Sequence, residues 1–138
     1  MSKPPGREVS ETAASRESAR DAGSNSLIAL IEDDDDIREA LESLLNHAGY
    51  RVLPYSSAET ALRDMEGGRH PDLILLDLMM PGMNGWQFRV EQKKRPALSD
   101  IPVIALSADV SPYAAAIDAD AYLKKPIDFE RLCVVIEQ

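Results

Sequence analysis

The chain has 138 residues, a net charge of −9 and a single cysteine. That length suits one domain with one hydrophobic core and excludes two domains of ordinary size. The lone Cys133 excludes an internal disulfide, and no secretory signal precedes the apolar segments. No apolar run approaches the roughly 20 residues of a membrane-spanning helix. We therefore expect a cytoplasmic protein that does not associate with membranes.

Residues 1–26 contain four basic and four acidic side chains, so the whole net charge lies in residues 27–138. An acidic surface repels phosphate backbones, which argues against a nucleic-acid partner. The N-terminal segment is rich in Ser, Ala, Glu and Arg, and apart from Met1 its one aliphatic side chain larger than alanine is Val9. We therefore predict a disordered tail over residues 1–26 and one folded domain over residues 27–138.

From residue 27 onward, short apolar runs alternate with segments of helical period. This alternation is typical of a parallel sheet with helices on both faces. The predicted strands cover residues 27–31, 50–55, 72–77, 101–106 and 121–124. Helices are expected over about 36–47, 86–95, 111–117 and 128–137. A further short helix is expected to begin at the capping-box spacing between Ser56 and Glu59 and to end at about residue 66. Five such units predict a doubly wound sheet, in which ligands bind at the carboxyl ends of the strands.

Polar side chains that attract attention stand at the ends of the first, third, fourth and fifth predicted strands. These residues are Glu32 and Asp33 after the first strand, Asp77 at the end of the third, Ser107 after the fourth and Lys125 after the fifth. Strand ends of one sheet are neighbours in space, so three acids, a hydroxyl and an ammonium should converge on one cleft. A hard cation fits such an acid cluster, and Mg²⁺ commonly binds through one or two carboxylates together with water and phosphate oxygens.

Four segments resemble the signature segments of response-regulator receiver domains. They are Ile31-Glu32-Asp33-Asp34, the block from Leu75 to Gly85, Ile104-Ala105-Leu106-Ser107-Ala108, and Tyr122-Leu123-Lys124-Lys125-Pro126. The resemblance covers residues 27–138 and is most specific in the block from Leu75 to Gly85. It implies an α/β fold with a five-stranded parallel sheet in the flavodoxin-like order 2-1-3-4-5.

The resemblance also implies a role for each site residue. Asp77 would be the phosphoacceptor, and Mg²⁺ would be bound by Glu32, Asp33, Asp77 and the backbone carbonyl of Met79. Ser107 would sense the phosphoryl group, Lys125 would pair with it, and Tyr122 would be the switch aromatic. A carboxylate can attack phosphorus, and nearby positive charge offsets the repulsion between the two anions. The Lys125–Pro126 peptide bond is expected to be cis.

As a member of this family the chain would be a phosphoacceptor that assists its own phosphorylation and dephosphorylation, and not an enzyme with a separate substrate. The donor would be a histidine kinase or a histidine phosphotransfer protein, and output would pass to a downstream protein that the sequence does not name. Ser107 and Lys125 are closer in sequence than is usual in the family by about one helical turn. We therefore expect a shortened fourth helix and a monomer or weak dimer.

Two other functions compete with this prediction. The domain could be a receiver-like protein-binding module that works without phosphorylation. It could also be a Mg²⁺-dependent phosphohydrolase that uses Asp77 as nucleophile, but enzymes of the haloacid-dehalogenase type need a second acid two residues later, where this chain has Met79. A flavodoxin-like flavin binder would need a loop after the first strand that holds the flavin phosphate, and the acidic run from Glu32 to Asp36 would repel that phosphate.

Overall fold

The computed structural model describes residues 26–108 and 117–137 of the chain. Five strands form one parallel sheet in the order β2-β1-β3-β4-β5, as predicted. The strands are β1 (Leu27–Ile31), β2 (Arg51–Tyr55), β3 (Leu73–Asp77), β4 (Val103–Ser107) and β5 (Ala121–Lys124). The described helices are α2 (Asp35–His47), α3 (Ala58–Glu66), α4 (Gly85–Lys93) and α6 (Phe129–Glu137). The prediction of a shortened fourth helix falls largely on residues 109–116, which lie outside the described part of the chain.

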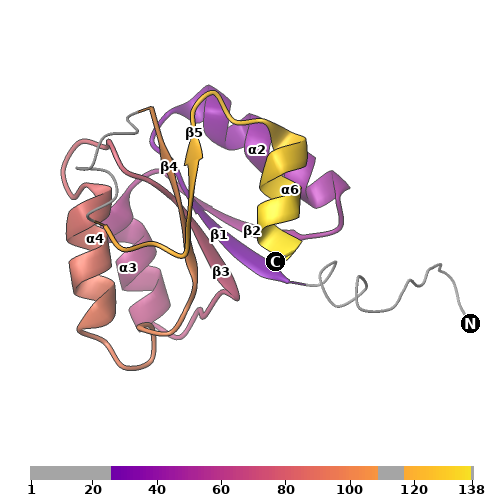
Figure 1. The fold of residues 1–138 in the computed structure, drawn as a ribbon. Coiled ribbons are helices and arrows are strands. Elements are labelled where there is room, and N and C mark those ends of the chain that lie inside the picture. Colours follow the sequence, from indigo (N-terminus) through magenta and orange to yellow (C-terminus); the bar gives the residue numbers. More distant parts are fainter. Residues whose placement is uncertain (1–25, 109–116, 138) are drawn as a thin grey trace, which may run out of the picture.

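Helices cover both faces of the sheet, with α3 and α4 on one side and α2 and α6 on the other (Figure 1). Alternate residues of β1 therefore enter different cores: Ala29 and Ile31 pack with α3 and α4, and Ile28 and Leu30 pack with α2 and α6. All five residues of β3 are buried, which explains why this strand reads as a continuous apolar run that ends in Asp77.

The helix boundaries agree with the predictions to within about two residues, but one cap differs. Ser57, and not Ser56, caps α3, because its side chain accepts a hydrogen bond from the Thr60 backbone N–H. Glu59 does not complete the predicted capping box. Its carboxylate accepts a hydrogen bond from the backbone N–H of Met83, in the loop after β3, at 3.1 Å. The Glu59 carboxylate thus bonds to the loop after β3 and not to the backbone at the start of its own helix.

The loop after β3 returns tightly to α4. A Cβ atom added to Gly85 would lie 2.6 Å from a side-chain carbon of Leu78 and 2.8 Å from its Cα, so only glycine fits there. Asn84 and Gln87 form a capping box at the start of α4 that the sequence analysis did not identify. These contacts fix the path of the chain immediately after Asp77.

Candidate phosphoacceptor and metal site

All five polar residues predicted from the strand ends lie at the carboxyl edge of the sheet. Glu32 and Asp33 directly follow β1, Asp77 is the last residue of β3, and Ser107 is the last residue of β4. Lys125 directly follows β5. Its backbone N–H donates to the Ser107 carbonyl oxygen at 2.8 Å. The parallel register therefore brings together residues from four separate strands.

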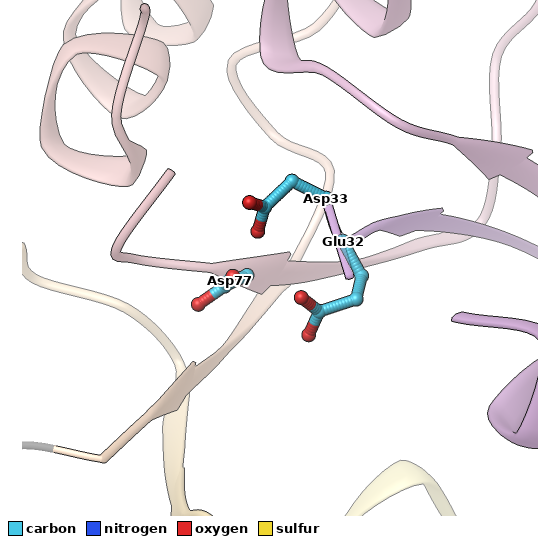
Figure 2. A group of neighbouring side chains, drawn as sticks. All are labelled: Glu32, Asp33 and Asp77. Carbon is cyan, nitrogen blue, oxygen red and sulfur yellow. The ribbon is translucent and has the colours of Figure 1, made fainter. Parts of the chain in front are cut away.

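The three acidic side chains form a cluster in which one carboxylate oxygen of each lies within 4.8 Å of the others. Figure 2 shows Glu32 and Asp33 reaching from the end of β1 into the same space as Asp77. Glu32 and Asp77 are buried, whereas Asp33 is accessible to solvent. The cluster is thus closed at its base and open on one side.

One ammonium group serves both buried carboxylates. The Lys125 Nζ lies 2.8 Å from a carboxylate oxygen of Glu32 and 3.4 Å from one of Asp77. Burial, followed by the charge of Glu32, raises the pKa of Asp77 to about 7, although Lys125 acts in the opposite direction. Burial alone would lower the pKa of Lys125, but its hydrogen bond to Glu32 and the charges of Asp77 and Glu32 raise it. Lys125 therefore remains a cation beside two acids.

The cluster suits a hard divalent cation. Its carboxylate oxygens include those of two buried side chains that pair with the same ammonium, and a bound cation would offset the burial and the charge of Glu32 that raise the pKa of Asp77. The Asp77 carboxylate also accepts a hydrogen bond from the backbone N–H of Met79 at 3.2 Å, which holds this part of the following loop against the acid. The Met79 side chain is 61% exposed, so it contributes little to the core.

Ser107 and Tyr122 differ in environment. Ser107 is buried at the end of β4, whereas Tyr122 on β5 is 42% exposed. The Tyr122 hydroxyl accepts a hydrogen bond from the Ala119 backbone N–H at 3.0 Å. The Lys125–Pro126 peptide bond is cis, as the resemblance implies.

Two residues near the site were missed by the sequence analysis. Arg38 on α2 donates to the carbonyl oxygen of Glu32, and Glu59 on α3 accepts from Met83 in the loop that follows Asp77. The Glu59 contact spans 24 residues, and no sequence spacing indicates it. Arg38 follows Glu32 by six residues, but only the turn into α2 brings its side chain back toward the end of β1.

The family model for the response regulator receiver domain matches residues 28–137, which is most of the chain. This chain belongs to that family. The receiver domain described here also has a fold shared by solved receivers. The signal receiver domain of a histidine kinase from Syntrophus aciditrophicus is 28% identical, with a TM-score of 0.74 over 81% of this chain and 87% of that chain. The receiver domain of the sensor histidine kinase PA1611 from Pseudomonas aeruginosa PAO1, solved with a magnesium ion in its active-site cleft, is 26% identical, with a TM-score of 0.75 over 82% of this chain and 95% of that chain.

Curated relatives are longer proteins. The probable transcriptional regulator ycf27 of Porphyridium aerugineum is 38% identical over 76% of this chain and 44% of its own length. The response regulator MprA of Mycobacterium sp. strain KMS is 36% identical over 76% of this chain and 46% of its own length. The receiver therefore spans less than half the length of these relatives. Among the described residues, no helix is both long and apolar enough to cross a bilayer.

Proposed function

We propose that Asp77 of this receiver accepts a phosphoryl group from a histidine kinase or a histidine phosphotransfer protein in a Mg²⁺-dependent reaction. The observation that carries the proposal is the setting of Asp77. Its carboxylate lies at the end of a buried strand, 3.4 Å from the Lys125 ammonium, and one of its oxygens is within 4.8 Å of one oxygen each of Glu32 and Asp33. A nucleophile, a cation and a metal-binding acid pair are the groups that phosphoryl transfer to a carboxylate requires.

Glu32, Asp33 and Asp77, with the backbone carbonyl of Met79, would hold the metal ion. When bound, Mg²⁺ supplies positive charge that offsets the repulsion between the carboxylate and the phosphoryl oxygens. The hydrogen bond from the Met79 N–H to the Asp77 carboxylate supports this assignment, because it holds the backbone of Met79 beside the acid cluster.

The residues of the chain supply the remaining steps. A bond forms between an Asp77 oxygen and phosphorus while the bond from phosphorus to the histidine nitrogen of the donor breaks. Lys125 is held beside Asp77 by its ion pair with Glu32, so its ammonium is already in place to pair with a phosphoryl oxygen. Lys125 remains charged throughout, because its pKa is raised in this setting.

Ser107 and Tyr122 would transmit the change in charge. The phosphoryl group would draw the Ser107 hydroxyl toward it through a charge-assisted hydrogen bond, and the space this leaves would admit the Tyr122 ring. In the structure the ring is partly exposed and its hydroxyl is bonded to Ala119, so an inward turn has to break this hydrogen bond.

We further propose that the receiver passes its signal on through contact with another protein, as a monomer or weak dimer. The net charge of −9 favours a protein partner over a nucleic acid.

Intact-mass measurement with a small phosphodonor tests the phosphoacceptor assignment. Incubation with acetyl phosphate or phosphoramidate and Mg²⁺ should add one phosphoryl group to the chain, and EDTA should prevent this. The Asp77→Asn variant should remain unlabelled, whereas Asp36→Asn, which removes an exposed carboxylate, should be labelled like the parent. Full labelling of Asp77→Asn would overturn the assignment, and failure of the parent to label would favour a phosphorylation-independent binding module.

A further inference from the structure

We propose that Arg38 is a positioning residue for the acidic loop, defined as residues 32–35, and that it sets the affinity of this loop for Mg²⁺. The inference rests on the proposed function in one respect, namely that the acidic loop binds the metal. It adds a role for Arg38, a cation that is not one of the proposed metal ligands. The same guanidinium contacts both ends of the loop, with Asp33 between the two contacts.

The Arg38 guanidinium donates two hydrogen bonds to the acidic loop. Nη1 of Arg38 donates to the carbonyl oxygen of Glu32 at 2.9 Å, and Nη2 donates to a carboxylate oxygen of Asp35 at 2.6 Å. The Arg38 side chain is 16% exposed, whereas that of Asp35 is 77% exposed. The guanidinium therefore lies inside the turn between β1 and α2, and it is not a freely solvated surface charge.

This contact completes a set of bonds that fixes Glu32 at both its backbone and its side chain. One carboxylate oxygen of Glu32 bonds to Lys125, and the other accepts the backbone N–H of Asp34 at 3.1 Å. The Asp34 carboxylate in turn accepts the N–H of Ile37 and so caps α2. Arg38 adds the one described side-chain bond to the Glu32 carbonyl, immediately before Asp33.

Asp33 itself needs this support. It is the solvent-accessible member of the acid cluster, and the backbone on either side of it determines where its carboxylate points. A planar guanidinium has donors in a fixed fork and can hold two acceptors at a set separation, which the single ammonium of lysine does not reproduce. Loss of the two guanidinium hydrogen bonds should therefore make the acidic loop more mobile, even in a variant that keeps the positive charge.

The direction in which the Mg²⁺ affinity changes when Arg38 is replaced distinguishes a positioning role from a purely electrostatic one. A cation close to the acid cluster opposes the binding of a second cation, so a role through charge alone predicts tighter Mg²⁺ binding when Arg38 is neutralised. Positioning predicts weaker binding. Lysine at this position retains the charge and loses the fork, so it distinguishes the two explanations.

The experiment is a Mg²⁺ titration of the whole chain followed by amide NMR, with the parent, Arg38→Lys, Arg38→Met and Lys94→Met. Lys94 is a 64% exposed cation after α4 and serves as the matched control for loss of one positive charge. Both Arg38 variants should bind Mg²⁺ about tenfold more weakly, as is typical when an outer-shell partner of a metal ligand is removed. Lys94→Met should bind like the parent. Parent-like binding by Arg38→Lys, or tighter binding by Arg38→Met, would overturn the proposal.

A readout without metal tests the positioning role directly. Hydrogen exchange of the Asp34 and Ile37 amides should be faster in Arg38→Lys than in the parent, and exchange in β3 should be unchanged, which excludes general unfolding. Unchanged exchange in the loop would overturn the positioning role whether or not Mg²⁺ binds. If the parent protein itself shows no response to Mg²⁺, the proposed function fails instead, and the two failures are thereby distinguished.

The Asp35 contact can be tested separately, since Asp35 and Asp36 are adjacent exposed acids in the first turn of α2. Asp35→Ala and Asp36→Ala each remove one negative charge, so their electrostatic effects on Mg²⁺ should be similar. Asp35→Ala should weaken Mg²⁺ binding several-fold more, because it also removes one acceptor of the Arg38 fork. Equal effects of the two substitutions would overturn this part of the proposal.

Discussion

The Lys125 ammonium lies 2.8 Å from a carboxylate oxygen of Glu32, although 93 positions separate the two residues. Because the same ammonium is the cation beside Asp77, one positive charge is shared between two buried carboxylates. Burial, together with the charge of Glu32, raises the pKa of Asp77, and the shared ammonium does not offset both effects. Ionisation of Asp77 in the metal-free protein therefore lowers the free energy of unfolding.

The first prediction concerns pH. The pKa of Asp77 in the folded chain, about 7, lies above its ordinary value of 3.8. Between these two values the folded state holds a proton that the unfolded state has released, so the free energy of unfolding falls as pH rises through this window. Without Mg²⁺, Asp77→Asn should be more stable than the parent by as much as about 4 kcal/mol at pH 8, given 1.36 kcal/mol for each pKa unit of the rise. The difference should shrink toward pH 4. Urea denaturation at several pH values measures it, and a difference independent of pH would contradict the electrostatic cause.

The second prediction is that Mg²⁺ stabilises the unphosphorylated protein, because the carboxylates are brought together only in the folded state. Ten times the dissociation constant of Mg²⁺ should add about 1.4 kcal/mol to the free energy of unfolding. Asp33→Ala should remove this response and keep the fold, and Asp36→Ala should retain it. Thermal melts with and without MgCl₂ measure the response, and stabilisation that survives in Asp33→Ala would show that Asp33 is not a ligand.

The third prediction is that Gly85→Ala destabilises the domain by about 2 kcal/mol or more, because overpacking against backbone cannot be relieved by a side-chain rotation. The added methyl group would meet the Cα of Leu78 at 2.8 Å. Gly67→Ala is the matched control, since its Cβ would meet only ordinary contacts at 3.4 Å or more, with φ of −77°. Equal melting temperatures for the two variants would mean that the loop after β3 can move away.

The fourth prediction concerns the N-terminal segment. Deleting residues 1–25 should leave the melting temperature and phosphorylation nearly unchanged, since the segment has almost nothing apolar to dock. The deletion should stop before Ser26, because the carbonyl of this residue accepts a hydrogen bond from the Arg51 N–H at the start of the sheet. Differential scanning calorimetry of the two chains is the measurement, and a large drop in melting temperature would show that the segment packs on the domain.

The fifth prediction concerns the switch. Amide NMR of the free and beryllofluoride-bound forms, with beryllofluoride standing in for the phosphoryl group, should show shifts at Asp33 and Asp77 that extend to Ser107 and Tyr122. The Ala119 amide should shift as well, because its hydrogen bond to the Tyr122 hydroxyl is lost when the ring turns inward. Shifts confined to the loops around Asp33 and Asp77 would favour a binding module without a switch.

The sequence by itself determined the parallel sheet, the positions of its strands and the polar residues at its carboxyl edge. It could do so because burial on both faces leaves continuous apolar runs, as in Leu73-Ile74-Leu75-Leu76, and because the ends of parallel strands meet at one edge. These are local patterns combined with one general rule of topology.

Only the tertiary structure decided how the charges pair. Glu59 lies at a capping-box spacing from Ser56, but its carboxylate bonds to Met83 instead. Arg38 and Lys125 are both basic residues near acids in the folded chain, yet Arg38 holds a loop and Lys125 joins two strands. Long polar side chains can reach several partners at similar energy, so the choice among them depends on burial and distance, which the order of residues along the chain does not specify.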